Sequence, residues 1–83
     1  MNKDDLVRFA NEIALTSLNY DVEISKEKID FFHSELSRYP IERIENAFRQ
    51  HRRESNKFPT LADILWKIKN PDFNGGHRKL RLI

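Results

Sequence analysis

The sequence predicts an all-α fold, a compact bundle of about four short helices followed by a flexible C-terminal tail. Four stretches repeat apolar residues at the helical spacing of three or four, and none alternates strictly enough for a β-strand. The three prolines, at positions 40, 59 and 71, and the Gly75-Gly76 pair all fall between these stretches. We therefore expect a helical domain over residues 1–70 and a basic tail over residues 71–83.

The first helix is expected from about Lys3 to Leu18, with Asn2 as its N-cap and two aspartates in its first turn. Polar residues off its apolar stripe, Glu12 among them, are expected at the surface. The stripe expected to face the core comprises Leu6, Val7, Ala10, Ile13, Ala14, Ser17 and Leu18.

The second and third helices meet at Pro40. Ser25 is a good N-cap for the second helix, which should end before Pro40 because a residue preceding proline avoids the helical region. Pro40 suits the first position of the third helix, in which Glu45 and Arg49 form a favourable i, i+4 pair. The expected core stripes are Ile29, Phe32, His33, Leu36 and Tyr39, then Ile41, Ile44, Ala47, Phe48 and His51.

The fourth helix should begin after Pro59, with Thr60 and Asp63 as a capping box, and stop at Asn70. Its core stripe is expected to be Leu61, Ile64, Leu65 and Ile68. Trp66 falls about 140° from Leu61 around this helix and therefore off the stripe. Either another segment of the chain covers Trp66, or it is a surface anchor for a partner, because tryptophan is enriched at interaction hot spots.

The composition excludes several functional classes. Without cysteine there is no disulfide framework, thiolate zinc site or cysteine nucleophile, and two adjacent glycines cannot supply a Walker A or dinucleotide-binding loop. We therefore expect no cofactor. No apolar run is long enough for a membrane span, and the N-terminus lacks the order of a signal peptide, so we expect a cytoplasmic location.

Catalysis is the function that the sequence supports least. His33, His51 and His77 lie 18 and 26 residues apart, so no pair has metal-binding helical spacing, and the first two are expected to be partly buried structural residues. The carboxylates are spaced as helix-terminus and surface charges. We expect no catalytic residues and no metal ligands.

The net charge of +2 resides in the tail, because residues 1–70 contain 12 basic and 12 acidic side chains. The tail alternates basic and apolar residues, which is typical either of a segment that folds onto a partner or of a frayed end. Its candidate partner-binding residues are Arg78, Lys79, Leu80, Arg81 and Leu82.

The densest basic cluster comprises Arg49, Arg52, Arg53 and Lys57. The three arginines share one helix face, so these residues are candidate nucleic-acid contacts; the alternative is a solvated helix end whose cations suit the helix dipole. A conventional major-groove helix is disfavoured, because base-reading residues lie near the N-terminus of such a helix, where this one carries Glu42 and Glu45.

Two proline-associated helix starts support a family resemblance. The sequence contains Phe31-Phe32, a Leu-x-x-Tyr-Pro junction ending at Pro40, Ala47-Phe48, and Lys-Phe-Pro-Thr-Leu-Ala-Asp-Ile over residues 57–64. With this pattern it resembles the phage proteins that load or inhibit replicative helicases. The resemblance implies a small helical N-terminal domain and a C-terminal region that engages a hexameric DnaB-type helicase, without an ATP site of its own.

The resemblance leads to the hypothesis of a non-enzymatic adaptor that binds a hexameric replicative helicase, as loader or inhibitor, in phage or mobile-element DNA replication. An origin-bound initiator would be a second partner, and weak DNA contact is compatible with the hypothesis. Only about 13 residues follow Asn70, fewer than in the family, so Trp66 and the arginine cluster stay as rival surfaces. The alternatives are a small DNA-binding accessory or regulatory protein, and a phage inhibitor of another host machine.

Overall fold

Four helices make up the part of the protein that the computed structural model describes, residues 1–71, and this part contains no strand. Helix α1 spans Lys3–Tyr20, α2 spans Lys26–Leu36, α3 spans Ile41–Glu54 and α4 spans Leu61–Lys69. The predicted all-α class is confirmed. Of the tail expected over residues 71–83, all but Pro71 lies outside the described residues.

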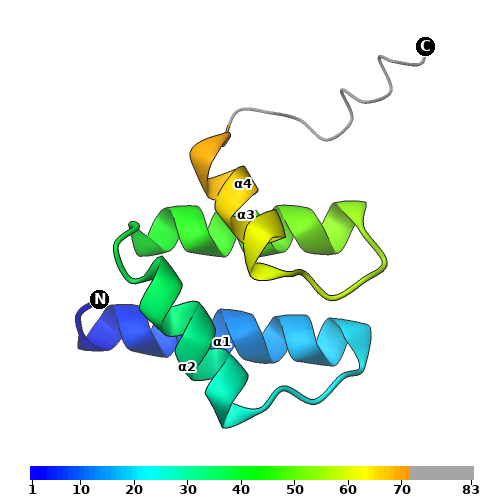
Figure 1. The fold of residues 1–83 in the computed structure, drawn as a ribbon, viewed down its shortest axis with the longest axis horizontal. Helices are drawn as coiled ribbons and strands as arrows, with labels where there is room; N and C mark the ends of the chain where they lie inside the picture. Colours follow the sequence, from blue (N-terminus) through cyan, green and yellow to red (C-terminus); the bar gives the residue numbers. More distant parts are fainter. Residues whose placement is uncertain (72–83) are drawn as a thin grey trace.

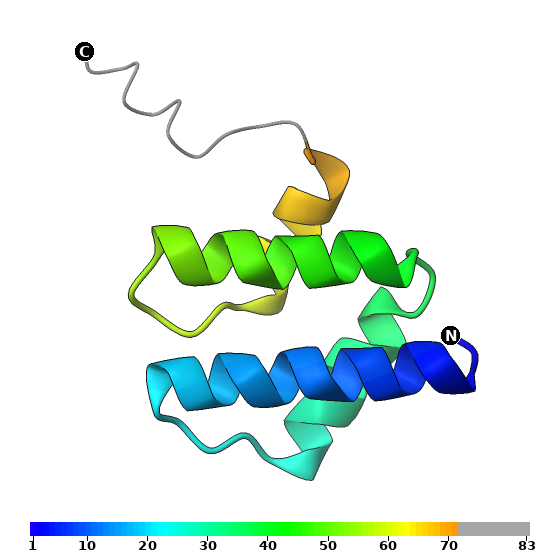
Figure 2. The same cartoon turned by 180° about the vertical axis from the view of Figure 1, so that it is seen from behind.

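Helices α1 and α3 lie side by side and run in the same direction, while α2 and α4 both cross one face of this pair (Figure 1 and, from behind, Figure 2). The parallel direction follows from the contacts along the pair. Arg8, early in α1, meets Glu45, early in α3, and Tyr20 at the end of α1 meets Ser55 after α3. Helix α2 connects the end of α1 to the start of α3, and so returns the chain to the end of the pair at which α1 began.

The helix starts agree with the caps read from the sequence, with one exception. The side chains of Asn2 and Ser25 each accept a backbone N–H three residues on. The Thr60 hydroxyl accepts the Asp63 N–H at 3.1 Å, and the Asp63 carboxylate accepts the Thr60 N–H at 3.0 Å, which completes the predicted capping box. Pro40, however, is the N-cap of α3 in an extended conformation, so α3 begins one residue later than predicted.

Two helix ends differ from the prediction. Helix α1 continues two residues past Leu18, because Asp21 takes a left-handed conformation with φ 55° and closes the helix as a C-cap. Aspartate is one of the few residue types that tolerate this conformation. Helix α2 ends at Leu36, and the turn before Pro40 is closed by a Tyr39 N–H bond to the Leu36 carbonyl oxygen.

The core lies between α1, α2, α3 and α4. Leu36, Ile44, Phe48 and Ile64 are completely buried, and the whole predicted stripe of α3 is buried. In α2 and α4 the most buried side chains are Phe32, Leu36, Ile64 and Ile68, all members of the predicted stripes. The remaining predicted stripe residues of these two helices are partly buried around this cluster.

The stripe predicted for α1 is wrong. Leu6, Val7 and Leu18 are 42%, 56% and 78% exposed, whereas the buried residues are Phe9, Glu12, Ile13 and Thr16. Only Ile13 belongs to both sets. Helix α1 turns this second face inward because Phe9 and Ile13 join the core while Glu12 and Thr16 bond to side chains of α3, which compensates for the burial of their polar atoms.

No helix among residues 1–71 combines the length and the apolar content that crossing a bilayer requires.

Candidate functional site

An ion-pair network joins α1 to α3. The Nε and Nη2 atoms of Arg8 donate to the two carboxylate oxygens of Glu45 at 3.0 and 2.6 Å. Arg52 donates through Nη1 to the Glu12 carboxylate and to the Thr16 hydroxyl, the latter at 2.9 Å. Arg49 lies between them, within 3.8–3.9 Å of both carboxylates. Charges therefore alternate along the α1–α3 contact.

Glu12 was expected at the surface, but its side chain is only 5% exposed. The correction has a physical cause: two guanidinium groups from α3 surround this carboxylate, and a buried charge is tolerated when it is paired and hydrogen-bonded. The partner Arg52 is 18% exposed and Arg49 is 50% exposed. Arg53 and Lys57 are exposed. The predicted basic cluster is thus divided: Arg49 and Arg52 form ion pairs with α1, although Arg49 stays half-exposed, and Arg53 and Lys57 are exposed outside these ion pairs.

The pKa of Glu45 is lowered, first by the hydrogen bonds from Arg8 and then by the positive charges of Arg8 and Arg49, against the opposing effect of burial. The same hydrogen bonds raise the pKa of Arg8. A carboxyl group whose pKa is lower in the folded state stabilises the fold above its ordinary pKa and loses that contribution as the pH falls.

The stability of the domain should therefore fall as the pH drops below about 4.5, the ordinary value for Glu45, toward its lowered pKa. Glu45→Gln should be less stable than the parent at neutral pH, and the difference between the two should shrink on acidification. Urea unfolding at a series of pH values measures this difference. Glu23→Gln, which removes an exposed carboxylate outside the network, is the control; a difference for Glu45→Gln that stays constant with pH contradicts the assignment.

Trp66 lies at the surface, 46% exposed, which selects one of the two placements left open by the sequence. It lines a shallow pocket of about 710 Å³ between the end of α3, the following connector and α4. Phe58 supplies a second aromatic wall, and Glu54, Lys57 and Lys67 supply charges. The combination of an exposed indole with a charged rim is typical of protein interfaces.

Hydrogen bonds to the backbone hold the connector that forms this pocket. The Nε2 atom of His51 lies 2.8 Å from the Lys57 carbonyl oxygen, and the Tyr20 hydroxyl donates to the Ser55 carbonyl oxygen at 2.9 Å. Burial raises the pKa of this tyrosine. His33 is partly buried, as predicted, with its ring in a T-shaped contact with that of Phe9, whereas His51 is buried more deeply than predicted.

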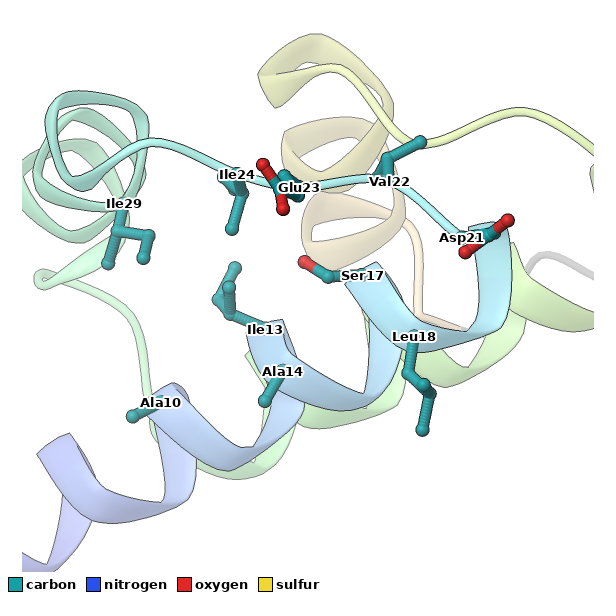
Figure 3. A pocket seen from close by; sticks show the side chains of 10 residues that line it. All are labelled: Ala10, Ile13, Ala14, Ser17, Leu18, Asp21, Val22, Glu23, Ile24 and Ile29. Carbon is teal, nitrogen blue, oxygen red and sulfur yellow. The ribbon is translucent and has the colours of Figure 1, made fainter.

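A second concavity runs along α1 on the side away from α3. This groove has a volume of about 460 Å³ between α1, the connector that follows it and the start of α2 (Figure 3). Ile13, Ser17 and Ile24 converge in it, and the carboxylates of Asp21 and Glu23 lie along its rim. Sequence reasoning missed this groove because it assigned the same apolar residues to the core. The available signal was that apolar residues occupy more than one face of α1.

The candidate partner-binding residues Arg78, Lys79, Leu80, Arg81 and Leu82 lie outside the described residues. Within residues 1–71, no group of three or more histidine, aspartate or glutamate side chains is arranged to hold a metal ion. The described residues thus form two concave surfaces, the Trp66 pocket and the α1 groove.

One comparison with known proteins agrees with the motifs of the sequence. No curated protein and no solved structure matches the chain. A family model that describes the N-terminal domain of a phage helicase loader/inhibitor matches residues 1–65, which include α1, α2, α3 and the first turn of α4. This match covers well over half of the 83 residues, so the chain belongs to the family of this phage loader/inhibitor N-terminal domain, and the resemblance seen in its motifs is confirmed.

Proposed function

We propose that the protein is a non-enzymatic adaptor that binds a hexameric DnaB-type replicative helicase and acts as its loader or inhibitor during phage or mobile-element DNA replication. The family match over residues 1–65 is the observation that supports this proposal. The sequence supports it independently, because it lacks the glycine-rich loop that a loader with its own ATPase would need. An origin-bound initiator is the second partner that the proposal implies, and the cytoplasm is the compartment in which both are found.

Trp66 is the contact that we assign to the described domain. Its indole is half-exposed beside a pocket whose walls are held by backbone hydrogen bonds, so little side-chain or loop ordering is needed on binding. The basic and apolar side chains of Arg78, Lys79, Leu80, Arg81 and Leu82 are the second contact in the proposal. Together they would combine an aromatic anchor with an electrostatic attraction.

Trp66→Ala should weaken binding to the purified helicase hexamer at least tenfold, because truncating an interface tryptophan typically removes about 2 kcal/mol or more. Native mass spectrometry and a fluorescence-anisotropy titration with the labelled chain measure the complex. Phe31→Ala is the matched control, since Phe31 is an aromatic residue of similar exposure, 51%, on α2. If the parent chain forms no complex with the hexamer at micromolar concentration, the proposed function is wrong.

A small DNA-binding protein that uses Arg49, Arg52, Arg53 and Lys57 is the alternative. The structure offers it less support, because Arg49 and Arg52 are engaged with carboxylates of α1 and α3. Of these four cations, Arg53 and Lys57 are the two that are exposed and outside the ion pairs of α1 and α3. If these two alone contact phosphates, the logarithm of the binding constant should change with the logarithm of salt concentration by a slope near −2. A slope of about −4 on duplex DNA would show that all four cations contact phosphates and would favour the alternative.

A further inference from the structure

The outward face of α1 carries an apolar stripe that nothing in the described domain covers. Four of the seven large hydrophobic side chains that are exposed in this domain belong to α1: Leu6, Val7, Leu15 and Leu18. At about 100° per residue, Val7, Ala10 and Ala14 lie within about 40° of one line along the helix, with Leu6 and Leu18 flanking it on opposite sides. Leu15 falls outside this stripe. An exposed apolar face of this kind marks a surface that meets another protein.

Along the helix axis, the stripe is nearly symmetric about the level of residue 12, although the Glu12 side chain itself lies on the opposite, buried face. Ala10 and Ala14 lie at equal distances on either side of that position, as do Lys3 and Asp21 at the two ends of the stripe. Because the two alanines occupy its centre, the stripe is flat there, which allows the axes of two helices to approach closely. The bulky residues of the stripe lie toward its ends. A helix with this pattern matches a second copy of itself in the antiparallel direction.

The charges at the two ends are opposite in sign. Lys3 lies at the N-terminal end of the stripe, and Asp21 and Glu23 lie at its C-terminal end, on the rim of the groove in Figure 3. Within residues 1–71 none of these three side chains forms an ion pair. Antiparallel packing brings Lys3 of each copy to Asp21 and Glu23 of the other, whereas parallel packing brings like charges together.

We propose that the protein forms a two-fold symmetric dimer through antiparallel packing of α1 against α1 of a second copy. In this register Leu6 of one copy enters the groove of the other beside Ser17, and Val7 packs against Leu18 on the opposite side of the stripe. Figure 3 shows that separation, because the side chains of Ser17 and Leu18, which both line the groove, extend from different sides of α1. The interface is isologous, so each of these contacts occurs twice.

The groove supplies a second reason for this arrangement. The groove is lined mainly by aliphatic side chains, among them Ile13, Ile24 and Ile29. A leucine side chain fills apolar space there that the isolated chain leaves to solvent. The helix pair is only about 27 Å long and buries less than the roughly 800 Å² per partner of a standard interface, so we expect a dissociation constant of about 100 μM.

Sedimentation equilibrium of the full 83-residue chain, from about 10 μM to 1 mM, tests the dimer over the range that this affinity requires. The average mass should rise from the 10.0 kDa of one chain toward twice that value. Leu18→Arg should weaken association at least tenfold, while Leu15→Arg, the same substitution on another face of the same helix, should leave it within twofold. A parent chain that stays monomeric at 1 mM, or two variants that behave alike, overturns the proposal.

A charge exchange tests the antiparallel register separately. Lys3→Glu should weaken association about fivefold. The triple variant Lys3→Glu/Asp21→Asn/Glu23→Lys should restore it to within twofold of the parent, because the pair between positions 3 and 23 reforms with reversed signs and asparagine tolerates the left-handed conformation of position 21. Circular dichroism verifies that each variant is folded. Failure of the triple variant to recover excludes this register. None of these results depends on the helicase, so they stand apart from the test of the proposed function.

Discussion

Phe48→Ala should destabilise the domain by about 3–5 kcal/mol, the largest effect that we expect of any single substitution. Phe48 is completely buried, and its ring lies 6.2 Å, centroid to centroid, from that of Phe32, which places it where α2 meets α3. Alanine would leave a cavity that the surrounding helices fill only partly. Since a chain of this length has a total stability of roughly 4–12 kcal/mol, the variant should be close to unfolding at room temperature.

Urea unfolding followed by circular dichroism measures the loss, with the free energy extrapolated linearly to zero denaturant. Phe31→Ala is the matched control, because the neighbouring phenylalanine is 51% exposed and its truncation leaves no internal cavity. We expect that control to cost less than about 1 kcal/mol. Equal losses for the two variants would show that Phe48 does not lie at the centre of the core.

The contrast between α3 and α1 shows how far the fold can be predicted from the sequence. Helix α3 begins after a proline and has a single apolar stripe, so its buried residues could be named correctly from spacing alone. Helix α1 has apolar residues on two faces, and spacing selected the one that faces outward. The correct face carries Glu12 and Thr16, and their burial depends on Arg52, 40 and 36 residues farther along the chain. Local periodicity contains no information about such distant pairs.

The candidate surfaces show the same limit. The position of Trp66 around α4 indicated that it lies off the core stripe, and the structure places it at the surface. The arginine cluster was recognised from its spacing along the helix, but its ion pairs with α1 could not be, because the carboxylate of Glu12 was itself expected in solvent. A basic cluster in a short helical sequence therefore becomes a nucleic-acid candidate only after the partners of each cation are known.

Arg52→Ala should destabilise the domain by about 3 kcal/mol, since removing one partner of a buried ion pair leaves the other charge uncompensated. The Glu12 carboxylate, only 5% exposed, would keep Arg49 at 3.9 Å as its nearest cation. The Thr16 hydroxyl would also lose the hydrogen bond from Arg52. Chemical unfolding at neutral pH measures the effect. Arg53→Ala, which removes the exposed neighbouring arginine from the same helix end, should change stability by less than about 0.5 kcal/mol.

A double-mutant cycle of Glu12→Leu, Arg52→Met and the double variant Glu12→Leu/Arg52→Met measures the interaction of the pair, because methionine retains an apolar stem at position 52. The double variant replaces both partners by apolar side chains and removes the uncompensated charge, so it should be more stable than Arg52→Met alone. The coupling energy between positions 12 and 52 should exceed about 1.5 kcal/mol. If Arg52→Ala costs no more than Arg53→Ala, the pair between Arg52 and Glu12 adds nothing to stability. Arg52 would then be available to an acidic partner or to a phosphate group, as the alternative function requires.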